Sequence, residues 1–153
     1  MKSLELKIPP PVVAVVSGLG MWGISRVAPH LPLPASLRLA GCTIFVIASV
    51  FFSVAGVVSF RRARTTLNPT RPEATSSLVS SGIFRITRNP MYLGLTLFLV
   101  AWAIFLSSAV SLLGPAVFVL YVRRFQIVPE ERILAELFGS EYVDYRARVR
   151  RWL

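Results

Sequence analysis

Two polar clusters hold most of the residues in this chain that could do chemistry. The first, residues 88–94, is a basic turn at the start of about thirty residues without a charge. The second begins with the adjacent carboxylates Glu130 and Glu131 and continues through Tyr145 to Arg151 and Trp152. If the apolar stretch between them turns back on itself, both clusters meet on one side of a bilayer and can build a single pocket.

The residue types in these clusters favour cofactor binding over hydrolysis or metal chemistry. The sequence has no Ser/His/Asp set, no His or Cys pattern typical of a metal site and no glycine-rich phosphate loop. Its one histidine, His30, is expected on the opposite side of the membrane. The clusters instead contain Arg, Asn, Tyr and paired Glu side chains. These favour a site that binds a polar cofactor while an apolar partner enters from the lipid.

The composition predicts that this site lies at a membrane. Hydrophobic residues make up 54% of the 153 residues and the mean hydropathy is +0.64, well above a soluble domain. The charge-free runs near 8–25 and 39–60 each fit one span, because a helix needs about 20 apolar residues to cross a bilayer. The run near 89–122 fits two short spans joined at Ser107 and Ser108. We expect an all-α integral membrane protein with about four transmembrane helices.

The net charge of +10 follows membrane topology rather than a nucleic-acid surface. With a cytoplasmic N-terminus, only Arg26 and Arg38 fall outside, as the positive-inside rule expects when both termini are cytoplasmic. The expected partners are therefore membrane lipids, and no nucleic acid or metal. The lack of a recognisable targeting segment favours a bacterial inner membrane. Arginines between 146 and 151 are expected to contact lipid headgroups.

The chain is predicted to be one membrane domain. Beyond the spans, Pro129 and Gly139 mark the start and the end of a short amphipathic helix on the cytoplasmic side. The domain, 1–153, is divided into an N-terminal helical hairpin (1–60), a cytoplasmic connector (61–90), a second hairpin (91–125) and a C-terminal tail (126–153).

Five short motifs occur in order between residues 67 and 153. They are Ser80-Ser81-Gly82-Ile83-Phe84, Arg88-Asn89-Pro90-Met91-Tyr92-Leu93-Gly94, Glu130-Glu131, Phe138-Gly139 and Tyr142-x-x-Tyr145. Their order and spacing resemble the integral-membrane methyltransferases typified by isoprenylcysteine carboxyl methyltransferase and phospholipid N-methyltransferase. The first two helices match this family only in being hydrophobic. The resemblance implies S-adenosylmethionine as the methyl donor and a C-terminal tail that binds it.

The resemblance also implies which residues contact this cofactor. Glu130 would accept hydrogen bonds from ribose hydroxyls or pair with the donor's ammonium, and Arg88 would meet its carboxylate. Tyr92 and Phe84 would offer aromatic faces to adenine or to the sulfonium cation. Carried over position by position, the contacts are Ser76, Ser77, Leu78, Val79, Phe84, Arg88, Asn89, Pro90, Met91, Tyr92, Gly94 and Glu130.

The expected reaction is direct methyl transfer to a lipophilic small molecule or lipid in the membrane. If the acceptor must lose a proton, Glu131 and Tyr145 are the candidate bases. Two residues depart from the prenylcysteine enzymes. Asn89 replaces a common histidine, and Gln126 stands where we align an arginine thought to meet the acceptor's carboxylate. Gln126 is thus the third candidate catalytic residue, and a prenylcysteine carboxylate is not the expected acceptor.

Two other functions are compatible with the sequence. One is an NADPH-dependent reductase resembling the membrane sterol reductases, and the other is a non-enzymatic membrane scaffold protein. The single residues also have structural explanations. Arg88 could anchor the chain at the membrane surface, Asn89 could cap the helix that Pro90 begins, and the two glutamates could complement a helix dipole.

Overall fold

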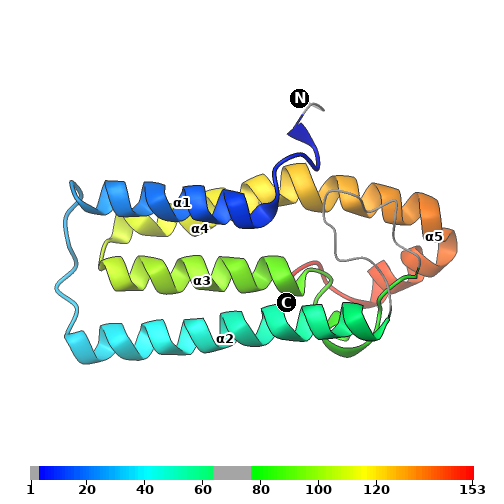
Figure 1. Cartoon of the computed structure of the whole chain (residues 1–153), viewed down its shortest axis with the longest axis horizontal. Coiled ribbons are helices and arrows are strands. Elements are labelled where there is room, and N and C mark those ends of the chain that lie inside the picture. The colour runs from blue at the N-terminus through cyan, green and yellow to red at the C-terminus, as the bar shows by residue number, and fades with distance from the viewer. Residues whose placement is uncertain (1–3, 64–76) are drawn as a thin grey trace.

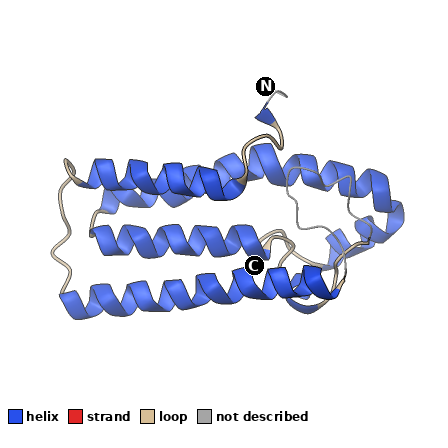
Figure 2. Cartoon of the chain, in the orientation of Figure 1, coloured by secondary structure: helices blue, strands red, loops and turns tan. Residues whose placement is uncertain are grey.

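The computed structural model describes residues 4–63 and 77–153, and all regular structure in these ranges is helical (Figures 1 and 2). The all-α prediction is confirmed for this part of the chain. The main helices are α1 (Pro10–Ser25), α2 (Ala35–Arg62), α3 (Pro90–Leu106), α4 (Leu113–Val122) and α5 (Val128–Arg148). Two short 3-10 helices, Gly82–Arg85 and Ala109–Leu112, and a π-helical turn, Arg123–Ile127, complete the set.

Helices α1 to α4 lie side by side, and α4 runs through the π-helical turn directly into α5 (Figure 1). The predicted turn after α3 is confirmed, since Ser107 ends that helix with a left-handed φ of 48°. Gly139 ends the first part of α5 as predicted, with φ 50° and ψ −124°. The chain turns back at this glycine. Its last residues therefore return to the start of α3.

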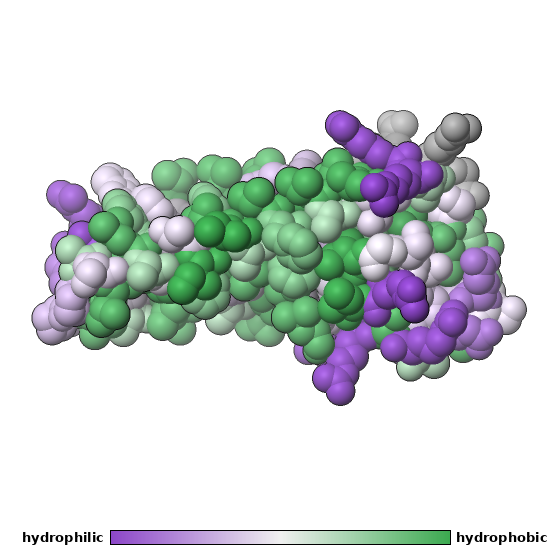
Figure 3. All heavy atoms as spheres, turned by 90° about the horizontal axis from the view of Figure 1, so that it is seen from below, coloured by the Kyte–Doolittle hydropathy of each residue, from purple (hydrophilic) through white to green (hydrophobic). Residues whose placement is uncertain are grey.

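The surface of the bundle fits a lipid environment. Figure 3 shows apolar side chains around its middle and polar ones gathered at the ends. Large apolar side chains such as Val16, Ile44 and Ile47 are more than 60% exposed. Among the described residues, two helices are long and apolar enough to cross a bilayer: α2 with 28 residues, and the continuous helical stretch Ala109–Arg148. Four spans remain a prediction, because α1 and α3 are apolar but have only 16 and 17 residues.

Helices α2 and α3 pack in antiparallel fashion with very close backbones. A Cβ atom added to Gly94 of α3 would lie 2.9 Å from the carbonyl oxygen of Ser49 and would also overlap Ser53 Oγ. A Cβ atom added to Gly56 of α2 would lie 2.9 Å from Met91 Cγ. Small residues at such a crossing let two helices approach within a membrane, where dispersion contacts replace the hydrophobic effect as the driving force. This contact sets where α3 begins and therefore positions the polar turn before it.

Candidate functional site

The two polar clusters meet at the end of the bundle where α3 begins and α5 folds back. Residues 149–153, which we call the closing segment, lie against the turn before α3. Arg88 N donates to the carbonyl oxygen of Arg150 at 3.0 Å, and Asn89 Nδ2 donates to that of Arg151 at 2.9 Å. Thr87 Oγ1 also donates to the Arg151 carbonyl oxygen, at 3.3 Å. The predicted meeting of the clusters is thus confirmed.

Glu131 is the centre of an ion-pair network at this end. Arg151 donates from Nε and Nη2 to the two carboxylate oxygens of Glu131, at 3.0 and 2.7 Å. Arg88 Nη2 lies 3.2 Å from the same carboxylate, and Arg88 Nη1 donates to the hydroxyl of Tyr142 at 3.3 Å. The side chains of Glu131 and Arg88 are only 12% and 10% exposed. Both oxygens of Glu131 are engaged by guanidinium groups, which does not fit the predicted role of a base.

Glu130 lies in a different environment from its neighbour. It is in α5, beyond the apolar part of the helical stretch Ala109–Arg148, which ends at Val122. Its Oε1 accepts a hydrogen bond of 2.5 Å from the hydroxyl of Tyr92 in α3. Burial raises the pKa of Glu130 to about 8, although the hydrogen bond from Tyr92 opposes this shift. This carboxyl group therefore holds a proton up to near-neutral pH.

Tyr145 and Phe84 belong to a second, apolar cluster beside the polar one. The Tyr145 hydroxyl donates to the carbonyl oxygen of Phe84 at 2.8 Å, and burial raises the pKa of Tyr145. The ring of Phe84 packs edge-on against Phe60 at 5.2 Å between centroids. Val79 is buried in this cluster, and Leu78 packs against it. The Tyr145 hydroxyl is committed to the fold, which argues against its predicted role as a base.

Other predicted contacts have structural roles in the described chain. Pro90 and Met91 pack against α2 at Gly56, and Gly94 permits the close approach of the helices. Ser77 Oγ donates to the carbonyl oxygen of Ala63 at 3.3 Å. Ser76 lies outside the described residues.

Asn89 occupies the N-cap position of α3, as the structural alternative expected, but its side chain does not act as the cap. Pro90 does begin the helix, but the side chain of Asn89 makes no capping hydrogen bond. Its amide instead ties the closing segment to the turn. Arg151 was expected to contact lipid headgroups, yet it pairs with Glu131. Thr87 was missed as a site residue, because no motif or spacing in the sequence relates it to the glutamate pair. Arg151 was placed in the second polar cluster but not among the candidate site residues.

Gln126 contacts a different part of the chain from the other candidate residues. It lies in the π-helical turn, is fully buried, and its Nε2 donates to the carbonyl oxygen of Ile8 at 2.7 Å. The neighbouring Phe125 carbonyl accepts from Leu6 N at 2.9 Å, and Glu5 pairs with Arg124 in this turn and with Arg132 in α5. Gln126 thus joins the helix to the segment before α1. Its predicted contact with an acceptor stays a prediction.

Comparison with known proteins identifies a family. Residues 37–141 match the family described as phospholipid methyltransferase. The chain is 30% identical to protein-S-isoprenylcysteine O-methyltransferase B of Arabidopsis thaliana over 109 residues, which is 71% of this chain and 55% of that protein. It is 30% identical to protein-S-isoprenylcysteine O-methyltransferase of Saccharomyces cerevisiae over 83 residues, 52% of this chain and 34% of the yeast protein.

A third relative is shorter than this chain. It is a protein of Haemophilus influenzae described as uncharacterized, 46% identical over 63 residues, which is all of that protein and 41% of this chain. No solved structure matches the chain. The family match includes Tyr92 in α3 and Glu130 at the start of α5. It also covers most of α2, so the expectation that the first two helices match only in being hydrophobic is wrong for the second helix. The chain belongs to the phospholipid methyltransferase family of membrane methyltransferases that use S-adenosylmethionine.

Proposed function

We propose that this protein transfers a methyl group from S-adenosylmethionine to a lipophilic acceptor, a lipid or lipid-like small molecule held in the bilayer. The observation that carries the proposal is the buried Glu130 carboxyl group at the polar end of an apolar helix bundle. Its hydrogen-bond donor is Tyr92, and it pairs with no cation within residues 4–63 and 77–153. A buried carboxyl group of this kind is suited to a cationic ligand.

The residues fit the cofactor that the family uses. Arg88 Nε is buried and has no hydrogen-bond partner in the described part of the chain, so this end offers a donor for an anion. Glu130 directly precedes Glu131, the partner of Arg88, and offers an acceptor for a cation. The amino-acid portion of S-adenosylmethionine carries an ammonium and a carboxylate on one carbon. Arg88, Glu130 and Tyr92 would hold that portion.

The bound cofactor would supply a methyl group on a positively charged sulfur. Around it, Tyr92 would steady the Glu130 carboxyl through their hydrogen bond, and the closing segment would keep water from the turn at Arg88. Glu131 and Tyr145 already have partners, so neither is proposed as the base. Glu130 would hold the cofactor's ammonium, and that cation would lower the raised pKa of its carboxyl group. Alignment of donor and acceptor would then be the main source of rate, worth up to about 7–11 kcal/mol.

The orientation in the membrane follows from the arginines. We place the polar end with residues 88 and 131 in the cytoplasm, because Arg26 and Arg38 are the only arginine or lysine residues at the opposite end within residues 4–63 and 77–153. Both termini then lie in the cytoplasm. The membrane in this proposal is a bacterial inner membrane. Reporter fusions at residue 153 and in the loop before α2 test it. A reporter active outside the cytoplasm at residue 153 would contradict the orientation.

The test of function is calorimetric titration of the detergent-solubilised protein with S-adenosylhomocysteine and, in parallel, with NADPH. We expect saturable binding of the first ligand alone. Glu130→Gln should weaken that binding at least tenfold, whereas Glu136→Gln, on an exposed position of the same helix, should leave it unchanged. Binding of NADPH alone would support a reductase instead. Binding of neither ligand by a folded sample would support a non-enzymatic scaffold.

A further inference from the structure

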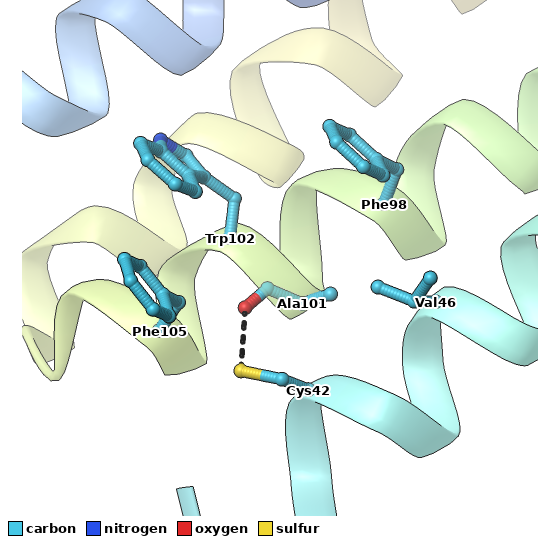
Figure 4. Close-up of a pocket in the computed structure, with 6 residues that line it drawn as sticks. All are labelled: Cys42, Val46, Phe98, Ala101, Trp102 and Phe105. Carbon is cyan, nitrogen blue, oxygen red and sulfur yellow. Dashed lines mark hydrogen bonds between the residues drawn. The ribbon is translucent and has the colours of Figure 1, made fainter. Parts of the chain in front are cut away.

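An apolar groove opens on the surface of the bundle between α2 and α3. Six residues line it: Cys42, Val46, Phe98, Ala101, Trp102 and Phe105 (Figure 4). The groove wall is entirely apolar, and the side chains of Phe98 and Phe105 are about half exposed. The groove has a volume of about 180 Å³. The groove can therefore hold a stretch of hydrocarbon chain but not a whole cofactor.

The aromatic wall of the groove is held in place. The rings of Trp102 and Phe105 stack with centroids 5.4 Å apart and planes 12° apart. Trp102 Nε1 donates to the carbonyl oxygen of Gly18 in α1 at 3.0 Å, which fixes the indole. On the other side, Cys42 Sγ donates to the carbonyl oxygen of Ala101 at 3.4 Å (Figure 4). The groove is thus formed by ordered side chains with their polar atoms already engaged.

A cationic side chain stands at one end of the groove. Arg38 lies one helical turn before Cys42 and two turns before Val46, so all three share one face of α2. The Arg38 guanidinium carbon lies 5.9 Å from the ring centroid of Phe105. Arg38 Nε is buried and has no hydrogen-bond partner within residues 4–63 and 77–153. A guanidinium donor without a partner is costly when buried, and phosphate oxygens match it well.

We propose that the groove binds one acyl chain of a phospholipid whose negatively charged headgroup is held by Arg38. A neutral hydrocarbon would fill the groove but leave the Arg38 donor unsatisfied. A soluble anion would meet Arg38 but leave the apolar wall empty. A phospholipid with a net negative charge satisfies both.

This lipid would be distinct from the methyl acceptor. Trp102 lies ten residues after Tyr92 in α3, which at about 1.5 Å per residue places the groove roughly 15 Å further along the helix from Glu130. The headgroup at Arg38 lies further still, at the opposite end of the bundle. The bound lipid therefore belongs to the other leaflet, and its binding does not depend on the proposed methyltransferase activity.

Tryptophan fluorescence offers a direct test, because Trp102 lines the groove. The sequence has three tryptophans, so the double variant W22F/W152F leaves Trp102 as the single emitter. The protein is placed in nanodiscs that contain phosphatidylglycerol or phosphatidylcholine with brominated acyl chains, which quench a tryptophan on contact. We expect half-maximal quenching at an at least threefold lower fraction of brominated phosphatidylglycerol than of brominated phosphatidylcholine.

Two further variants separate a site from general charge attraction. Arg38→Gln should abolish the preference for phosphatidylglycerol. Arg26→Gln, which removes the other arginine at this end, should preserve it. Equal quenching by both lipids in the parent, or a preference that survives Arg38→Gln, would overturn the proposal.

A second measurement avoids the tryptophan substitutions. Native mass spectrometry of the otherwise unaltered protein and of its Arg38→Gln variant counts the phospholipids retained at rising concentrations of each lipid. Retention of phosphatidylglycerol by the unaltered protein, reduced at least threefold by Arg38→Gln, supports the site. Equal retention by both proteins refutes it. Binding of S-adenosylhomocysteine, measured on the same samples, should not change, so failure of this site and failure of the proposed activity can be told apart.

Discussion

Arg151 holds Glu131 with two parallel hydrogen bonds, from Nε and Nη2 to the two carboxylate oxygens. The pair joins the closing segment to α5 across twenty residues. The backbone carbonyl oxygen of Arg151 also accepts hydrogen bonds from Thr87 and Asn89 in the turn before α3. A single residue near the C-terminus thus joins α5 to the turn where the proposed cofactor site lies.

Removing this arginine should loosen the polar end. We expect Arg151→Ala to reduce the free energy of unfolding by about 1–3 kcal/mol, because Glu131 is largely buried and would lose two charge-assisted hydrogen bonds. Thermal denaturation in detergent measures the effect. Arg148→Ala is the control, since Arg148 is exposed in the same region and should change the midpoint little. Equal midpoints for the two variants would contradict a structural role for the pair.

The stability of the protein should depend on both the charge and the size of the side chain at residue 89. Its amide nitrogen donates to the Arg151 carbonyl oxygen, so Asn89→Ala should cost about 0.5–1.5 kcal/mol of stability. Asn89→Asp keeps the shape but places a carboxylate oxygen against that carbonyl oxygen, and it should destabilise more than alanine does. Chemical denaturation of both variants gives the order. If aspartate proves the milder change, the amide does not serve as this donor.

Glu130 should make stability depend on pH. Because its pKa in the folded protein is about 8, above the ordinary value of 4.5, the folded state binds more protons than the unfolded state between these values. Stability from this group is therefore fully present below about pH 4.5 and falls as pH rises to about 8. The slope from one group is at most about 1.4 kcal/mol per pH unit.

Denaturation of the protein at a series of pH values measures this dependence. The neutral variant Glu130→Gln should show a flatter profile, whereas Glu136→Gln should keep the slope of the parent. A parent profile with no fall between pH 5 and 8 would mean that Glu130 is ionised in the folded protein.

The contact between α2 and α3 should not tolerate a methyl group at residue 94. Gly94→Ala would force the new Cβ atom against the backbone of Ser49, which only a separation of the helices can relieve. Overpacking of this kind costs about 1–3 kcal/mol. Gly20→Ala is the matched control, since a Cβ atom there meets open space and alanine favours the helix by up to about 1 kcal/mol. The two variants should shift the melting midpoint in opposite directions.

Much of the architecture followed from the sequence because it depends on local composition. The apolar runs predicted helices at α1 to α4, and Ser107 and Gly139 marked turns that the structure confirms. The expectation that the clusters at Arg88 and Glu130 meet also held, since an even number of antiparallel helices returns the chain to the same side. These features need only periodicity, length and backbone preferences.

The sequence by itself determined an all-helical chain with its basic residues gathered at one end, because hydrophobicity and charge act residue by residue. Only the tertiary structure decided which of two adjacent glutamates pairs with arginine and which is buried beside Tyr92. Side chains one position apart on a helix point about 100° apart, so their environments depend on what packs against each face. Asn89 and Arg151 received their roles in the same way, from contacts between segments more than sixty residues apart.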